Sequence, residues 1–297
     1  VMLTKSKHKS ISFELEGTNS AGDLGAAASV SFQHRNLFRG SETFMVKFRG
    51  AYEAISGLQP GYKNHNYTEY GVETSINFPN FLFPFLTSDF KRRIKATTEF
   101  GLQYNYQLRP EFSRTIASAS WSYKWIQKQK IQHRIDLLDI SYLYLPWISS
   151  QFQEDYINKD KDNYILKYNY ENRLIVRMGY NYSYNSAGGT LVNNTITTNS
   201  YSIRAGFESA GNILYGISKM INMRKNKDGE YAILGIPYAQ YLKGDFDFAK
   251  NIIIDHRNSL AFHAGIGIAV PYGNAKVVPF EKRYFSGGAN SVRGWSV

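Results

Sequence analysis

The side chains that could carry chemistry are numerous, but they form no catalytic pattern. The chain has 35 lysine and arginine residues, 24 aspartate and glutamate residues, six histidines and no cysteine. Without cysteine, a disulfide framework, a thiolate nucleophile and a thiolate metal site are all excluded. The histidines show no HExxH or other paired-ligand spacing, and no Ser-His-Asp arrangement is evident. We predict no catalytic residue, no metal and no cofactor, while a hydrolase triad assembled from distant strands stays open.

Two stretches resemble ligand loops without completing them. Asp160, Asp162 and Asn163 follow the start of a calcium loop, but the glycine and the closing glutamate of that motif are missing. The glycines of "GGANSVRG" (287–294) lack the Lys-Ser/Thr pair of a phosphate-binding loop. The first stretch is therefore interpreted as a solvated loop. The second stretch is not predicted to be a phosphate-binding loop of that motif.

The net charge of +11 would ordinarily suggest a nucleic-acid partner. The cations, however, are interleaved with acids on the polar faces of alternating segments, which indicates a water-filled lumen crossed by ion pairs. We therefore expect no nucleic acid. The cations are Lys47, Arg49, Lys95, Arg109, Arg114, Lys124, Arg173, Arg177, Arg204 and Lys243, and the acids are Glu14, Glu16, Glu53, Glu73, Glu99, Glu208, Asp245 and Asp247. The run Lys91-Arg92-Arg93 is expected at a solvated strand end, with contact to acidic lipid or lipopolysaccharide as the alternative.

The elements that position these charges are long strands. In "IKATTEFGLQYNYQLR" (94–109) apolar and polar residues alternate throughout, which predicts one strand with an apolar face and a wet face. The same period recurs in about eleven segments, many of about ten residues or more, the length that a tilted strand needs to cross a bilayer. The phase changes near Leu137 and Leu138, which predicts a bulge. A short helix is expected within "SSQFQEDYINKDKDN" (149–163).

Composition agrees with a membrane barrel. Aromatic residues make up 15% of the chain, which favours strands, and they gather near strand ends as in the aromatic girdles of membrane barrels. No apolar run approaches the roughly 18 residues of a membrane-spanning helix. Connections are expected to alternate between short ones at a periplasmic end and long ones at the other end. The predicted fold class is all-β, a transmembrane antiparallel β-barrel.

The stretch "YFSGGANSVRGW" (284–295) has the residues of a specific loop. Gly287 and Gly288 permit positive φ and close backbone approach. Val292 and Trp295 supply apolar anchors, and Arg293 before Gly294 offers a planar fork for a carboxylate. Spacing alone leaves a functional loop and a floppy surface loop equally open.

This stretch resembles the sixth-loop signature of the BamA/TamA superfamily of outer-membrane assembly and translocation barrels. Val292, Arg293 and Gly294 match that signature, and Trp295 stands where phenylalanine or tyrosine is usual. Three further stretches are similar to the TamL-like branch: "QHRNLFRGSETFMVKFRGAYEA" (33–54), "FESAGN" (207–212) and "GIPYAQYLKGDFDF" (235–248).

The resemblance implies a protein that acts without chemistry in the outer membrane of a Gram-negative bacterium. Residues 1–297 would be one partial barrel domain with about eleven of an expected sixteen strands, the POTRA domains and the last strands lying outside it. Arg293 would be an internal strut that pairs with acidic groups on the barrel wall. The first strand would form half of a lateral gate, through Ile11, Phe13, Glu14, Leu15, Glu16 and Gly17.

By the same resemblance, the gate would insert or export client proteins. The implied partners are outer-membrane lipid, lipopolysaccharide, the clients themselves and a TamB-like periplasmic protein. Two alternatives of a different class stay open, a two-partner secretion transporter of the same fold and a passive outer-membrane pore.

Overall fold

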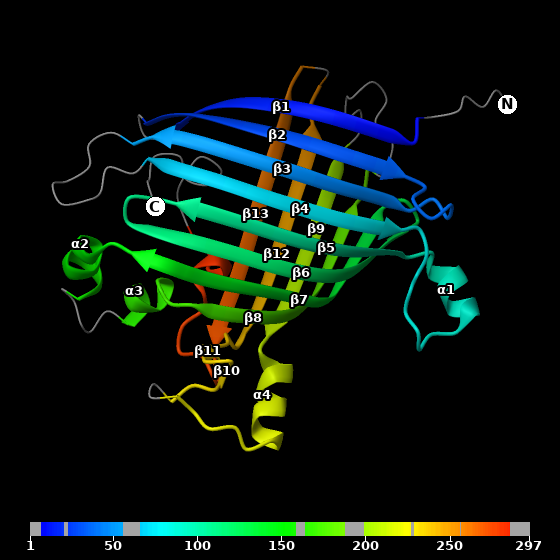
Figure 1. Ribbon diagram of the computed structural model, residues 1–297. Coiled ribbons are helices and arrows are strands. Elements are labelled where there is room, and N and C mark those ends of the chain that lie inside the picture. Colours follow the sequence, from blue (N-terminus) through cyan, green and yellow to red (C-terminus); the bar gives the residue numbers. More distant parts are fainter. Residues whose placement is uncertain are drawn as a thin grey trace.

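One antiparallel sheet of eleven strands makes up most of the molecule (Figure 1). The computed structural model describes residues 7–20, 23–55, 66–158, 164–187, 199–226, 229–255 and 257–285. Each strand pairs with its neighbours in chain order, so the predicted strand number and fold class are confirmed. The strands are β1 (Lys9–Ser20), β2 (Asp23–Arg35), β3 (Thr43–Ala54), β4 (Tyr67–Phe78), β5 (Thr97–Leu108), β6 (Phe112–Gln127), β7 (Ile131–Ile148), β8 (Arg173–Asn185), β9 (Ser200–Ala210), β12 (Tyr241–Ile253) and β13 (Ser259–Pro271).

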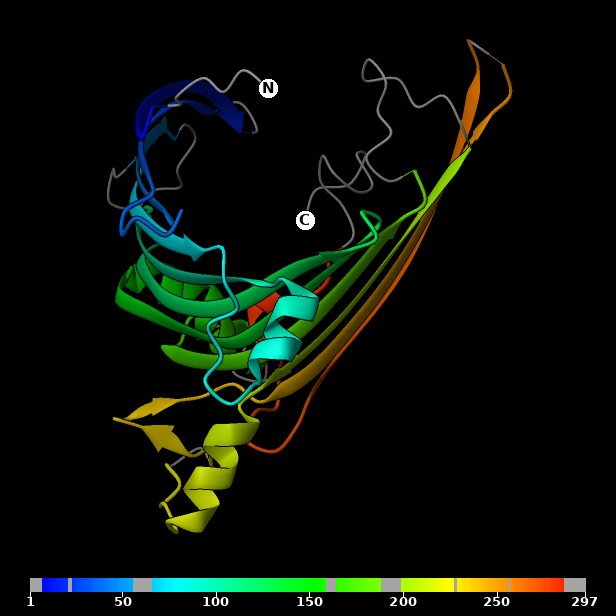
Figure 2. The ribbon, with the colours of Figure 1, turned by 90° about the vertical axis from the view of Figure 1, so that its right-hand side faces the viewer.

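The sheet curls so that one face is concave, and β1 and β13 stand apart as its two edges (Figure 2). Side chains alternate between the faces because successive residues of a strand point in opposite directions. Charged and small polar residues share the concave face, while leucine, isoleucine, phenylalanine and tyrosine dominate the convex face. On β1, for example, Phe13 and Leu15 are 74% and 87% exposed on the convex side.

The connections divide between two ends of the sheet. The near end, at which β1 begins, holds the short turns 36–42, 128–130 and 254–258. The far end holds the long connections 149–172 and 211–240, as predicted. The alternation is incomplete, because the near end also holds the 79–96 connection and the far end includes the three-residue turn 109–111.

The remaining elements are short. The 79–96 connection contains α1 (Ser88–Ile94), and 149–172 contains α2 (Ser150–Phe152), the π-helical turn η1 (Gln153–Ile157) and α3 (Tyr164–Asn169). The predicted short helix in 149–163 is thus confirmed. The 211–240 connection contains α4 (Asn212–Met220) and the hairpin of β10 (Ala232–Ile233) and β11 (Ile236–Pro237), and the 3-10 helix η2 (Phe280–Lys282) follows β13. Among the described residues, no helix is long and apolar enough to cross a membrane.

One predicted strand boundary is wrong. The strand expected over 94–109 begins at Thr97, and Lys91, Arg92 and Arg93 lie in the last turn of α1 and not at a strand end. Three cations at the C-terminus of this helix and Asp89 in its first turn both complement the helix dipole. Lys95 then adopts the left-handed conformation and ends the helix before the strand starts.

The predicted bulge at Leu137 and Leu138 is confirmed. Asp136 and Asp139 of β7 pair with Gly179 and Arg177 of β8, so three steps along β7 match two along β8. A second irregularity of β7 lies between the partners of Ser113 and Thr115 on β6 and contains Pro146. Proline cannot donate to a ladder hydrogen bond, so a register shift suits it.

The buried apolar cluster lies at the far end, where the chain returns across the strand ends. Leu143 of β7, Ile175 of β8 and Ala210 of β9 pack with Tyr241 and Val278. Gly211 begins α4 beside this cluster with φ of 75°, and its N–H donates to Val176 O at 2.8 Å. A Cβ at position 211 would clash with Ala239 O and lie 3.0 Å from Gln240 Cα.

Gly211→Ala is therefore expected to destabilise the protein by about 2 kcal/mol or more, because an L-residue is strained at this φ and the site has no free space. Urea unfolding of the detergent-refolded protein, followed by tryptophan fluorescence, measures the loss. The matched control is Gly216→Ala inside α4, where nothing lies within 4 Å of the added Cβ. That variant should be neutral or more stable by about 0.5–1 kcal/mol, and equal loss in both variants would contradict the argument.

Candidate functional site

The outer edge of β1 presents backbone groups that pair with no other strand among the described residues. Arg35 N–H donates to His8 O at 2.7 Å, so these two opposite residues form a hydrogen-bonded pair. The same register continues along β1 and β2, where Ser12 lies opposite Ser31. Because hydrogen-bonded and non-hydrogen-bonded pairs alternate in an antiparallel ladder, even-numbered residues of β1 turn their N–H and C=O toward β2. The odd-numbered residues turn theirs away from the sheet. These are four of the six predicted gate residues, Ile11, Phe13, Leu15 and Gly17.

The other two predicted gate residues fix β1 to the sheet on the concave face. Glu14 accepts hydrogen bonds from Ser29 Oγ at 2.9 Å and from Lys47 Nζ at 3.2 Å. Glu16 pairs with both terminal nitrogens of Arg49, at 3.3 and 3.1 Å. Lys47 and Arg49 belong to β3, so both ion pairs reach across β2. They can do so because β2 carries only small residues at these positions.

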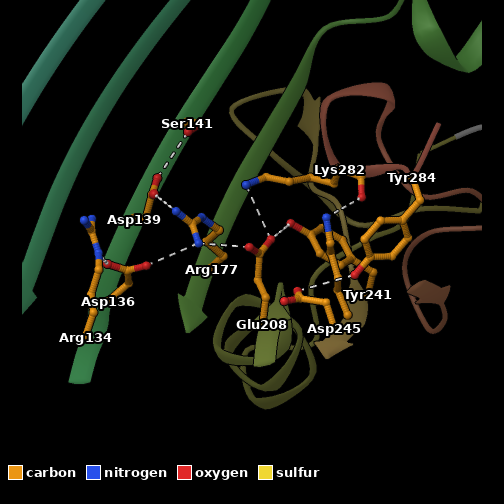
Figure 3. A network of polar contacts seen from close by, with 11 residues as sticks. Arg134, Asp136, Asp139, Ser141, Arg177, Glu208, Tyr241, Asp245, Lys282 and Tyr284 are labelled. Atoms are coloured by element: carbon orange, nitrogen blue, oxygen red, sulfur yellow. Dashed lines mark hydrogen bonds and ion pairs between the residues drawn. The ribbon is translucent and has the colours of Figure 1, made fainter. Parts of the chain in front are cut away.

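A second polar cluster surrounds Arg177 on the concave face of β8 (Figure 3). One terminal nitrogen of Arg177 bonds to Asp139, and the other lies 2.9 Å from Glu208 and 3.5 Å from Asp136. Asp136 also accepts a bond from Arg134 Nε at 2.6 Å. Residues three apart on a regular strand face opposite sides, so Asp136 and Asp139 reach the same arginine only because of the bulge between them.

Glu208 of β9 connects this cluster to the segment after β13. Its Oε1 accepts a bond from the hydroxyl of Tyr241 and lies 3.4 Å from Lys282 Nζ. Burial lowers the pKa of Lys282, and the charge of Glu208 opposes that shift. Figure 3 shows Lys282 reaching toward Glu208 from the ribbon of the returning segment. The chain after β13 is thus held against the concave wall by a half-buried ion pair.

Tyr284 continues this contact along β12 and β13. Its hydroxyl donates to Gly244 O at 3.1 Å, and Lys243 Nζ lies 4.2 Å from its ring centroid. Burial, and then the nearby Asp245, raises the pKa of Tyr284 to about 12, so the phenol stays protonated and can donate. A Cβ at Gly267 would clash with the ring of Tyr284, so glycine is required for the ring to rest on β13. Glu281, which precedes Tyr284 in the same segment, pairs with Arg114 of β6 at 3.2 Å.

The structure brings together many of the charges that the sequence placed on polar faces. Lys47 with Glu14, Arg49 with Glu16, Lys124 with Glu99 and Arg177 with Glu208 all form ion pairs. The predicted loop residues Gly287, Gly288, Val292, Arg293, Gly294 and Trp295 lie outside the described residues. Sequence reasoning missed Asp136, Asp139, Tyr241, Lys282 and Tyr284. For the two aspartates, the predicted bulge was the available signal, because it shifts Asp139 onto the polar face.

A curled antiparallel sheet with an apolar convex face, a charged concave face and strands of 11 to 18 residues is the wall of a transmembrane β-barrel. A comparison with protein families agrees: the Omp85 superfamily domain matches residues 10–297, and the chain therefore belongs to the Omp85 superfamily. A comparison with curated proteins finds no match. Omp85 proteins reside in the outer membranes of Gram-negative bacteria and organelles and act in protein insertion and translocation there, as assembly factors without catalysis.

Arg177→Met is expected to lower the free energy of unfolding by about 3–5 kcal/mol, because it leaves Asp136, Asp139 and Glu208 together without their shared cation. Urea unfolding in detergent measures the change. Arg204→Met is the control: Arg204 lies on the same concave face, is exposed, and makes no ion pair within the described ranges. The control should change stability by no more than about 0.5 kcal/mol. Similar stability of the two variants would show that the cluster contributes little.

Proposed function

We propose that this protein inserts or exports client proteins at the outer membrane of a Gram-negative bacterium through a lateral gate whose movable side is the outer edge of β1. The observation that carries the proposal is that edge. Ile11, Phe13, Leu15 and Gly17 turn their backbone groups away from β2, and β1 has no second neighbour in the described part of the sheet. An unpaired edge in hydrocarbon is unstable and readily accepts another strand.

In this mechanism a strand of the client pairs with β1 by β-augmentation. The backbone of the client would satisfy the outward N–H and C=O groups of β1, so binding needs no particular client sequence. Side chains of the client would then alternate between lipid and lumen as those of β1 do. The step requires no bond making or breaking, so no catalytic residue or cofactor enters it.

The ion pairs of Glu14 and Glu16 support a gate that opens on one side only. They tie β1 to Lys47 and Arg49 of β3, so β1 is held by two strands and not by one ladder. Opening would therefore separate the outer edge of β1 from its closing strand while β1 stays on β2 and β3. The two hydrogen bonds between Arg49 and Glu16 also fix the relative orientation of these side chains.

Within the superfamily, the resemblance of residues 33–54, 207–212 and 235–248 favours the TamL-like branch. On that assignment the barrel would take part in membrane assembly together with POTRA domains and a TamB-like periplasmic protein. Outer-membrane lipid and lipopolysaccharide would surround its convex face, whose exposed residues include Phe13, Leu15 and Phe48.

The edge mechanism is tested by proline in β1. Phe13→Pro and Leu15→Pro each remove an outward N–H without removing a bond to β2, because edge strands tolerate proline on the free side. Each is expected to lower the yield of folded outer-membrane proteins by on the order of tenfold, since each lost bond is worth about 1 kcal/mol and the strand must still dock in register. Heat-modifiable migration of several outer-membrane proteins, in cells depleted of the native copy, measures the yield.

Phe13→Ala and Leu15→Ala are the matched controls, because they remove the same side chains and keep the N–H groups. They should retain most of the activity. The proposal is wrong if the proline variants fold in the membrane and support normal assembly, or if the alanine variants lose as much activity as the proline variants.

Arg293 is proposed as an internal strut that fixes its loop against the barrel wall. The support is the path of the chain just before it, where Glu281, Lys282 and Tyr284 all contact the concave face. Arg293→Ala is expected to lower the temperature at which the folded protein loses its heat-modifiable migration, and to reduce assembly with it. Arg293→Lys should restore little, because a single ammonium cannot replace a planar fork. Unchanged migration and unchanged growth under depletion of the native copy would refute this role.

The charged concave face also favours a second candidate, a secretion transporter or a passive pore. A lumen lined by ion pairs such as Lys124 with Glu99 is wet and would conduct ions. Planar-bilayer conductance separates the two functions. A large, steady conductance in the wild type that the proline variants leave unchanged, together with normal assembly in those variants, would favour the pore.

A further inference from the structure

The connection between β4 and β5 covers part of the convex face. Residues 80–95, here called the rim segment, include α1 and lie at the near end of the sheet (Figure 1). Leu82 N–H donates to Thr98 Oγ1 at 2.9 Å, and the hydroxyl of Tyr123 donates to Leu82 O at 3.2 Å. Thr98 and Tyr123 belong to the convex face, yet they are 0% and 2% exposed. The rim segment is therefore fixed to the lipid side of the wall.

Aromatic residues of the rim segment continue the aromatic band of that face. The ring of Phe81 lies 4.7 Å from that of Tyr123, and the Phe83 ring lies 5.6 Å from the Phe85 ring. Phe85 itself is 86% exposed, and Phe90 of α1 is also exposed. Aromatic rings at the end of a membrane strand mark the depth of the lipid head groups. The rim segment thus presents apolar side chains at the membrane interface.

The rim segment also carries several cations. Lys91, Arg92, Arg93 and Lys95 are accompanied by one acid, Asp89, so the rim segment carries a net charge of +3 (four cations minus one anion). None of the four cations forms an ion pair with a carboxylate in the part of the chain that the structure describes. This contrasts with the concave face, where cations such as Arg49 and Arg177 are neutralised by carboxylates.

We propose that the rim segment is a lipid-binding anchor that takes anionic phospholipid from the leaflet at the near end of the barrel. Phe85 and Phe90 enter the interface, and Lys91, Arg92 and Arg93 bind the lipid phosphates. Arginine suits this role because its fork pairs with two oxygens of one phosphate. The inference rests on the membrane barrel and on the near end lying at the periplasm, and it goes beyond the handling of clients. It assigns the phosphates to phospholipid because lipopolysaccharide occupies the opposite leaflet.

The chain contains no cysteine, so one probe can be placed on the rim segment. Thr87→Cys is suitable because Thr87 is exposed and its side chain makes no cap hydrogen bond. A polarity-sensitive fluorophore is attached at this position, and the protein is refolded into phosphatidylcholine vesicles that contain increasing phosphatidylglycerol. As the anionic lipid increases, the emission of the fluorophore should shift to the blue and its quenching by iodide should decrease. In the K91Q/R92Q/R93Q variant, the preference for phosphatidylglycerol is expected to fall by on the order of tenfold. High salt should weaken the preference in the unsubstituted protein.

Lys128→Gln with Lys130→Gln is the matched control, because this turn is also basic and lies at the same end without the phenylalanines. It should leave the response of the probe unchanged. Phe85→Ser should reduce protection from iodide while keeping the dependence on anionic lipid.

The inference is overturned if the probe responds equally in zwitterionic and anionic vesicles. It is also overturned if the triple glutamine variant, shown folded by heat-modifiable migration, behaves like the unsubstituted protein, or if only vesicles with lipopolysaccharide produce the shift. Because no client takes part in this assay, its failure leaves the proposed assembly function standing. Normal assembly by the proline variants, which would refute the gate, would likewise leave the lipid result unaffected.

Discussion

The structure depends on one constraint, that a backbone N–H or C=O group in hydrocarbon must find a partner within the protein. An antiparallel meander satisfies this for the nine strands between β1 and β13, each of which has two neighbours. In the part of the sheet that the structure describes, the two outermost strands are the exception. Edge strands in soluble proteins are commonly protected by inward charges, bulges or prolines. On β1 the charges of Glu14 and Glu16 face the lumen and are paired with β3. The side chains of Ile11, Phe13 and Leu15 face lipid. None of these residues blocks the free edge of β1, which stays open to another strand.

Lipid on one face of the sheet and water on the other determine which side chains alternate along each strand. Lipid on the convex side accepts apolar and aromatic residues, whereas water on the concave side accepts charges that would be costly to bury unpaired. The concave side gathers these charges into local groups centred on Glu14, Glu16, Arg177 and Glu208. The group at Glu208 also holds Lys282, so one carboxylate links the wall to the returning chain. Among the described residues the buried apolar cluster is small, so these pairs organise most of the interior of the barrel.

The sequence was sufficient to predict the strands and their faces because the side-chain period of a strand is two, and lipid and water make that period visible. It also located the bulge, through the change of phase at Leu137 and Leu138. It failed at α1, because Ile94 and Ala96 continue the alternation of β5 and conceal the end of a helix. Contacts such as Lys282 with Glu208 could not be predicted, because they join segments far apart in the chain whose approach is fixed by the curl of the sheet. The role of Arg293 remains a prediction, since it lies outside the described residues.

The bulge in β7 also determines where this barrel could change length during evolution. Loss of one of the two leucines between Asp136 and Asp139 would leave these aspartates two residues apart, and both would still face the lumen. Loss of a residue elsewhere in β7, for example between Asp139 and Leu143, would turn the rest of the strand inside out and remove Leu143 from the buried apolar cluster. Leu137 and Leu138 thus mark a point at which β7 tolerates a change in length without exchanging its inward-facing and outward-facing residues. Related barrels of unequal strand length could have diverged at such points as well as in their loops.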